Sequence, residues 1–248
     1  MNHRGKVLRE KIYRVATLLE QLLGIPNLPR RPPHPLDMLI ATVLSQHTND
    51  RNSHRAYVRL RQKYPTWENV LDAPLQGISS AIRPGGMAQQ KSMHIKKILS
   101  ALRMRYGGLD LRFLKKKTDE EIFEILLSLD GVGVKTASCV LLFSLRRDVF
   151  PVDTHIHRIC GRLGLAPKYK TPEKTFAWMK GNIPDGKAYS FHTNLIRFGR
   201  KTCRATNPLC GACGLYKICL FQEKNKFRAS MQTRTLAKNY DFMLLDHV

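Results

Sequence analysis

Apolar residues recur along most of the chain at intervals of three to four positions, which is the period of an amphipathic helix. Residues 6–23 gather their apolar side chains on one face, formed by Val7, Ile12, Val15, Leu18, Leu19, Leu22 and Leu23. Residues 36–45, LDMLIATVLS, are apolar on nearly every side, which predicts a helix buried within a core. Strand signals are scarce. We therefore expect an all-α protein.

Further helices are expected wherever the same period returns between turn signals. Glycine-containing turns lie at 83–86, 106–108, 130–133 and 184–186. Five prolines between residues 26 and 35 exclude a helix there and predict an extended connector. The expected helices occupy residues 50–63, 67–72, 88–106, 118–128, 134–145, 155–164, 171–181 and 188–201.

The charge balance points to a polyanionic partner. Lys and Arg number 42 against 19 Asp and Glu in 248 residues, a formal net charge of +23. Such an excess is typical of nucleic-acid binding, and an anionic membrane surface is the second candidate. No segment approaches the ~18 uninterrupted apolar residues of a membrane-spanning helix, and the N-terminus has no apolar signal core. We expect a cytoplasmic, nucleoid-associated protein that does not bind membranes.

The six cysteines fall into two groups. Cys139 and Cys160 lie in apolar helical patterns, where a small buried side chain is the expected role. The other four follow the spacing C-x6-C-x2-C-x5-C and are Cys203, Cys210, Cys213 and Cys219. Thiolates so close in sequence can enclose one metal centre with little loop-closure cost. An iron–sulfur cluster and zinc both remain open, and the single C-x2-C pair favours iron–sulfur.

A short glycine turn precedes an apolar helix at residues 129–145, LDGVGVKTASCVLLFSL. The first N–H groups of such a helix have no intrahelical partner and lie at its positive dipole end, so they can bind a phosphate. The candidate contacts are Gly131, Val132, Gly133 and Thr136. On the residues alone, a plain connector between two helices remains possible, and Lys135 could serve as a phosphate ligand or as a nucleophile.

Asp153 stands eighteen residues after Lys135, in the sequence VDTH directly before a helical pattern. Aspartate is a preferred N-cap residue, so helix capping is one interpretation. On the residues alone, capping is the favoured role of Asp153, and a chemical role stays open.

Taken together, the three motifs resemble those of the endonuclease III-type DNA glycosylases over roughly residues 36–221. The cysteine spacing is similar to the [4Fe-4S] loop of that family, and the glycine turn resembles its helix–hairpin–helix motif. The resemblance implies that the four clustered cysteines hold a [4Fe-4S] cluster and that Asp153 is the catalytic aspartate. It further implies that Lys135 is the nucleophile that forms a Schiff base with the sugar.

The family resemblance also implies a two-lobed, all-α fold. A six-helix barrel domain carrying the hairpin would span residues 37–148. An iron–sulfur cluster domain would combine residues 1–36 with residues 149–221, and residues 222–248 would form a basic C-terminal tail.

An enzyme that acts on a base in a duplex must extrude that base and fill the gap it leaves. The segment 44–52, LSQHTNDRN, aligns with the family's polar plug and offers Gln46 and His47 as candidates. The segment 83–92, RPGGMAQQKS, places Met87 at the apolar wedge. Further DNA contacts are expected from His155 and Arg204. Without the resemblance, Met87 is an ordinary turn residue and the plug candidates are the polar end of a buried helix.

The resemblance implies a base excision repair enzyme. It would remove a damaged base, by default an oxidised pyrimidine, from double-stranded DNA and nick the abasic site by β-elimination. We expect it to act as a monomer on DNA that contains a damaged base or an abasic site. Two alternatives remain: a monofunctional glycosylase with another damaged or mismatched base as substrate, and a non-catalytic helical DNA-binding protein with a structural metal.

Overall fold

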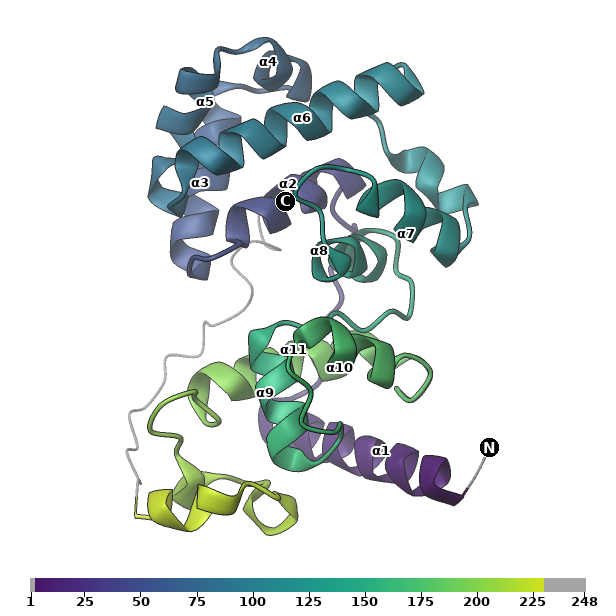
Figure 1. Ribbon diagram of the computed structural model, residues 1–248, viewed down its shortest axis with the longest axis vertical. Helices are drawn as coiled ribbons and strands as arrows, with labels where there is room; N and C mark the ends of the chain where they lie inside the picture. The colour runs from purple at the N-terminus through teal and green to yellow at the C-terminus, as the bar shows by residue number, and fades with distance from the viewer. Residues whose placement is uncertain (1–2, 230–248) are drawn as a thin grey trace. The chain divides into compact units, whose positions relative to one another are not determined.

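The computed structural model describes residues 3–229 and is built from helices joined by turns (Figure 1). Helices account for 66% of the structure, and no strand forms in the range 3–229. The expectation of an all-α protein is therefore confirmed.

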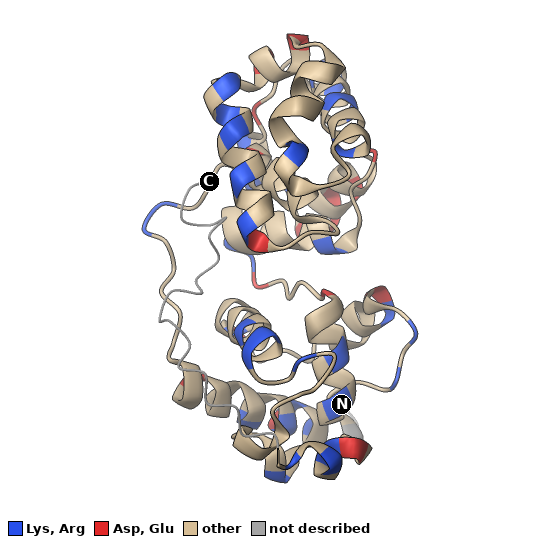
Figure 2. Cartoon of the chain, turned by 90° about the vertical axis from the view of Figure 1, so that its left-hand side faces the viewer, with Lys and Arg blue, Asp and Glu red and all other residues tan. Residues whose placement is uncertain are grey.

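The chain divides into two compact units. One unit consists of Arg31–Arg147. The other combines the residues up to Arg30 with the residues that follow from Asp148, so the N-terminal helix belongs with the C-terminal third of the chain. In the described range, residues 3–229, no helix is long and apolar enough to cross a membrane. Lys and Arg are distributed over both units (Figure 2).

The Arg31–Arg147 unit is organised around one buried helix, α2 (Pro35–Ser45). Its side chains are buried on almost every side, as its sequence predicts, and it packs against three other helices of the unit. The α-helices of this unit that follow it are α3 (Asp50–Lys63), α4 (Trp67–Asp72), α5 (Leu75–Ile82), α6 (Ala88–Tyr106), α7 (Asp119–Leu127) and α8 (Val134–Cys139). Short 3-10 turns, η1 (Arg83–Gly85) and η2 (Arg112–Lys116), link some of them.

Local capping chemistry explains where several of these helices begin. Pro35 occupies the first position of α2, and the ring of His34 accepts a hydrogen bond from the Leu36 N–H. At the start of α7, the Thr118 hydroxyl and the Glu121 carboxylate form a reciprocal capping box.

Two elements of this unit differ from the sequence-based expectation. Helix α5 was not expected, because its sequence LQGISSAI is short and contains a glycine. The single helix expected over 134–145 is α-helical only to Cys139 and continues as a π-helical turn, Val140–Ser144. The Leu145 N–H bonds to the Val140 carbonyl, five residues back, which an apolar run does not reveal.

The second unit places α11 (Ala188–Lys201) at its centre. This helix packs against α1 (His3–Leu23) and α9 (Thr154–Leu163), and α10 (Pro172–Met179) packs on α9. At the N-terminus of α11, the Glu20 carboxylate of α1 binds the Lys187 ammonium at 2.9 Å and the Ser190 hydroxyl at 2.6 Å.

The chain then continues as a loop with three short 3-10 turns, Cys210–Ala212, Tyr216–Ile218 and Gln222–Phe227. The last turn lies within the segment 222–248, for which the sequence predicts a basic tail. Residues 230–248 of that segment lie outside the described residues.

Candidate nucleic-acid interface and metal centre

The glycine turn between α7 and α8 contains one position with a backbone conformation that only glycine adopts easily. Gly131 has φ +75°, in the left-handed region, and a Cβ atom there would lie 2.6 Å from Nδ1 of His94. Gly133 is the N-cap of α8, is exposed, and has open space around it. Val132 is 7% exposed and anchors the turn in the core. The turn therefore presents open backbone at Gly133 on a fixed support.

Lys135 and Thr136 lie in the first turn of α8, directly behind Gly133. Lys135 is half-buried, and Thr136 is 3% exposed. The helical backbone runs unbroken from Val134 through the π-helical turn to Ser144, where it is fully buried. Lys135 thus stands at the start of a helical segment that is buried from Thr136 onward.

Asp130 places a negative charge in the same turn, and its carboxylate interacts with two side chains of α6. Its Oδ2 atom lies 3.0 Å from Nδ1 of His94 and 3.2 Å from Nζ of Lys97. Lys97, and then His94, lower the pKa of this carboxyl. The carboxylate is therefore held against α6 by its own partners.

Gln46 connects the end of α2 to this hairpin. Its Nε2 atom donates to the Gly131 carbonyl at 3.2 Å and lies 3.4 Å from the Thr136 hydroxyl oxygen. His47 follows with φ +51° and an exposed side chain. The structure thus brings Gln46, Gly131 and Thr136 together and leaves His47 on the surface beside them.

Met87 and a buried lysine mark the start of α6. Met87 has φ +48° and is 49% exposed. One helical turn later, Lys91 is 3% exposed, and its Nζ donates to the carbonyls of Leu44 and Gly85, both at 2.8 Å. Burial lowers the pKa of Lys91 to about 8. This ammonium links the end of α2 to the turn before Met87.

The role of Lys91 was not predicted from the sequence, although one signal for it exists. Lys91 falls on the buried face of α6 that also contains Ile95, Ile98 and Leu102. A lysine in register with an apolar stripe has to satisfy its donors inside the protein.

Asp153 belongs to the other unit, where it caps α9. Its Oδ1 atom accepts a hydrogen bond of 2.8 Å from the Ile156 N–H, so the capping interpretation describes its structural role. The side chain is half-buried. One carboxylate oxygen forms the capping bond, and the orientation of the whole group is fixed by the start of the helix.

Two further predicted DNA contacts, His155 and Arg204, are held by neighbours within the same unit. Nη2 of Arg158 lies 3.2 Å from Nδ1 of His155, and the same atom donates to the Cys203 carbonyl at 2.8 Å. Arg204 donates through Nη2 to the Asn207 carbonyl at 2.9 Å. Arg158 therefore connects α9 to the cysteine loop, while Arg204 is folded onto its own loop.

All four clustered cysteines line one small cavity of about 20 Å³, and each is partly exposed: Cys203, Cys210, Cys213 and Cys219. Arg162 of α9 reaches this cavity, with Nη1 3.5 Å from Sγ of Cys203, and the Arg162 carbonyl lies 3.5 Å from Sγ of Cys219. The Arg162 guanidinium also stacks on Phe221 at 4.3 Å from the ring centroid. The four cysteines of the loop and Arg162 of α9 therefore line the same small cavity.

The donor set of this cavity fits an iron–sulfur cluster. Burial, with a contribution from the neighbouring cysteines, raises the pKa of Cys213 to about 12 and also raises the pKa of Cys210. Such thiols need a bound cation to become thiolates. Within residues 3–229, no three His, Cys, Asp or Glu side chains converge on one point as ligands of a single ion do. Four cysteine thiolates are the usual ligand set of a [4Fe-4S] cluster.

Comparison with known proteins places these features in one family. The family model of the HhH-GPD superfamily base excision DNA repair proteins matches residues 40–185. A protein of Arabidopsis thaliana named as a DNA glycosylase is 40% identical over 165 residues, which are 66% of this chain and 56% of that relative's length. Endonuclease III of Thermotoga maritima is 35% identical over 201 residues, which are 81% of this chain and 89% of that protein.

A solved structure provides the same assignment for the fold. The structure of a trapped endonuclease III–DNA covalent intermediate superposes with a TM-score of 0.74 at 27% identity, covering 88% of this chain and 97% of that one. The chain therefore belongs to the HhH-GPD superfamily of base excision DNA repair proteins, as an endonuclease III-type DNA glycosylase.

Proposed function

We propose that this glycosylase is bifunctional: it excises a damaged base, most directly an oxidised pyrimidine, from double-stranded DNA and then nicks the abasic site. The observation that carries the proposal is the position of Lys135 in the first turn of the helix behind the glycine hairpin. Lys135 follows Gly133 by two residues, and the open backbone of Gly133 suits a DNA phosphate.

The first step that the proposal requires is attachment to the DNA backbone. The N–H groups at the start of α8 have no intrahelical partners, and the helix dipole adds partial positive charge at the same point. Pairing of Asp130 with Lys97 and His94 keeps its charge engaged with α6. A phosphate bound at Gly133 would hold the sugar of the neighbouring nucleotide close to the Lys135 amine.

The second step is chemical. The Lys135 nitrogen attacks C1′, and the glycosidic bond breaks with its electron pair leaving on the base, which takes up a proton. Opening of the sugar ring gives an iminium between Lys135 and C1′. Removal of a proton from C2′ then expels the 3′ phosphate and cuts the strand. We assign to Asp153 the stabilisation of the positive charge that develops on the sugar.

Extrusion of the base is assigned to two exposed residues on turns. His47 and Met87 both project from left-handed backbone, at φ +51° and +48°. Because Gln46 is tethered to the hairpin by the Gly131 carbonyl, His47 is the better candidate for the plug that fills the vacated stack. Met87 is the candidate for the apolar wedge.

The cysteine loop is assigned to a [4Fe-4S] cluster held by Cys203, Cys210, Cys213 and Cys219. When bound, the cluster cross-links a loop that has little regular structure, a structural contribution rather than a chemical one. Arg158 and Arg162 connect that loop to α9, the helix that Asp153 caps. The loop is therefore coupled to the orientation of Asp153 through this chain's own side chains.

The proposal is tested with a panel of duplexes that each contain one damaged or mismatched base, assayed separately for base release and for strand nicking. We expect release and nicking together, with oxidised pyrimidines as the best substrates. Release without nicking would identify a monofunctional glycosylase. Binding without either reaction would identify a non-catalytic DNA-binding protein. Sedimentation of the enzyme–DNA complex should give one chain per duplex.

A further inference from the structure

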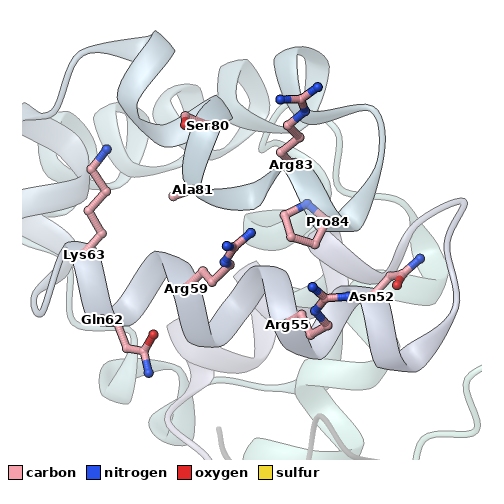
Figure 3. A pocket seen from close by; sticks show the side chains of 9 residues that line it. All are labelled: Asn52, Arg55, Arg59, Gln62, Lys63, Ser80, Ala81, Arg83 and Pro84. Atoms are coloured by element: carbon pink, nitrogen blue, oxygen red, sulfur yellow. The ribbon is translucent and has the colours of Figure 1, made fainter.

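Helices α3 and α5 and the η1 turn line an open cavity of about 760 Å³ in the Arg31–Arg147 unit, and Figure 3 shows its lining side chains. Nine side chains line it, and none of them is a carboxylate. Four are cations, namely Arg55, Arg59, Lys63 and Arg83. Asn52 and Ser80 add polar groups that can accept or donate hydrogen bonds.

Three of the four cations form a regular row along one face of α3. Arg55, Arg59 and Lys63 are spaced four residues apart, so they follow one another up α3, as Figure 3 shows. At a rise of about 1.5 Å per residue, the row is roughly 12 Å long. At about 3.4 Å of helix axis per phosphate of one DNA strand, that length corresponds to about three or four phosphates.

Within the described part of the chain, the charge of this cavity is left uncompensated. All four cations are exposed, and none forms an ion pair with a carboxylate of residues 3–229. Lys63 only approaches the Gly77 carbonyl at 3.5 Å and the Tyr64 ring at 5.4 Å. Like charges around one hollow repel, so this arrangement opposes folding and suits an anionic ligand.

Two residues that line the cavity lie close in sequence to the two turns assigned to base extrusion. Asn52 lies five residues after His47, and Arg83 lies four residues before Met87. We infer that this cavity binds the phosphates of the DNA strand that flanks the extruded nucleotide. The inference rests on the proposed function, and it extends that function to a second backbone contact that is separate from the hairpin.

The test compares two charge-matched variants. R59Q/K63Q removes two cations of the cavity, and K115Q/K116Q removes two exposed lysines of the same unit that do not line it. Binding to a duplex with a stable abasic-site analogue is measured as a function of salt. The slope of the logarithm of the DNA association constant against the logarithm of the salt concentration should become smaller in magnitude by about 2 for R59Q/K63Q. For the control variant, the slope should change by less than half of that amount.

Duplex length supplies a second readout. With the lesion moved stepwise toward either end, the wild type should lose affinity once the flank no longer reaches the cavity. R59Q/K63Q should not show that loss, and its melting temperature should equal or exceed that of the wild type because repulsion is relieved. Equal salt slopes for the wild type and R59Q/K63Q, or equal changes in both variants, would overturn the inference. Failure of the wild type to release any base contradicts the proposed function instead.

A different observation, the buried ammonium of Lys91, carries a second inference. Nζ of Lys91 binds the carbonyl of Leu44, which lies two residues before Gln46, and the carbonyl of Gly85, two residues before Met87. Left-handed backbone at a residue other than glycine is strained and persists only when the surroundings fix it. We infer that Lys91 is a positioning residue that holds the plug and wedge turns in register.

The test of Lys91 separates extrusion from chemistry. K91M should lower base release from a paired, damaged duplex by roughly 10-fold or more. Nicking of a preformed abasic site, which needs less unstacking, should fall several times less. K91R should recover most of the release. Equal losses in both reactions, with no recovery in K91R, would overturn the positioning role. K91Q, which keeps a donor, serves if K91M does not fold.

Discussion

Nε2 of Gln46 lies 3.2 Å from the carbonyl oxygen of Gly131 and donates a hydrogen bond to it. The bond connects residues 85 positions apart, at the end of α2 and in the glycine hairpin. It gives Gln46 a structural function inside the Arg31–Arg147 unit. His47, the next residue, is the exposed one.

This relationship predicts different phenotypes for two adjacent residues. Gln46→Leu removes a net contribution of about 1 kcal/mol, so it should lower base release and abasic-site nicking together, by roughly 5-fold. His47→Ala should lower release from a paired duplex more than it lowers nicking, because the abasic site lacks a paired base. Single-turnover assays on both substrates check this, and the opposite pattern would make Gln46 the plug.

Asp153 serves as a cap and, in the proposed mechanism, as a catalytic carboxylate, and two substitutions separate these roles. Asparagine is as good an N-cap as aspartate, so Asp153→Asn should keep the stability of α9 while base release falls at least about 100-fold. Asp153→Ala should in addition lower the free energy of unfolding by about 1 kcal/mol. Chemical denaturation and base-release assays measure the two effects. Near-normal release by Asp153→Asn would remove the catalytic assignment.

The cysteine loop predicts iron in the purified protein. The wild type should contain about four iron atoms per chain and should be brown, with visible absorbance. Cys213→Ser should lose iron and colour and melt at a lower temperature. Cys139→Ala is the matched control, because Cys139 is buried in the Arg31–Arg147 unit and does not line the cysteine cavity, so this substitution should leave the iron content unchanged. Stoichiometric zinc in place of iron would contradict the cluster assignment.

Lys91 predicts a specific pH dependence of stability. Burial lowers its pKa from 10.5 to about 8, so between these values the unfolded chain binds one more proton than the folded chain. The free energy of unfolding should therefore rise with pH across this window, because the cost of burying a charged ammonium is present below it. Relative to that of K91M, the free energy of unfolding of the wild type should increase by up to about 3 kcal/mol across this pH window. Denaturation curves of both proteins at pH 7.5 and 10.5 measure the gain, and a constant difference would contradict it.

Features contained in one continuous stretch of sequence could be predicted. The fold class, the buried helix at 36–45 and most helix boundaries follow from periodicity and caps that act over a few residues. The hairpin, VDTH and cysteine spacing are each local motifs, which is why a family resemblance could be recognised from them.

Features that depend on distant contacts could not be predicted in the same way. Lys91 satisfies its charge on the carbonyl of Leu44, 47 residues away, and nothing in either segment alone requires that bond. Whether Gln46 or His47 is the exposed residue depends on the Gly131 carbonyl. The π-helical turn after Cys139 has the same apolar letters as an α-helix, so only the backbone hydrogen bonds distinguish the two.

The most direct test of the central claim is borohydride reduction during the reaction with a duplex that contains one oxidised pyrimidine. Reduction converts an iminium between enzyme and sugar into a stable adduct, which peptide mass spectrometry can locate. The wild type should give an adduct on Lys135, and Lys135→Gln should give none. Release of the base by the wild type with no covalent adduct, or an adduct on another residue, would contradict the role of Lys135.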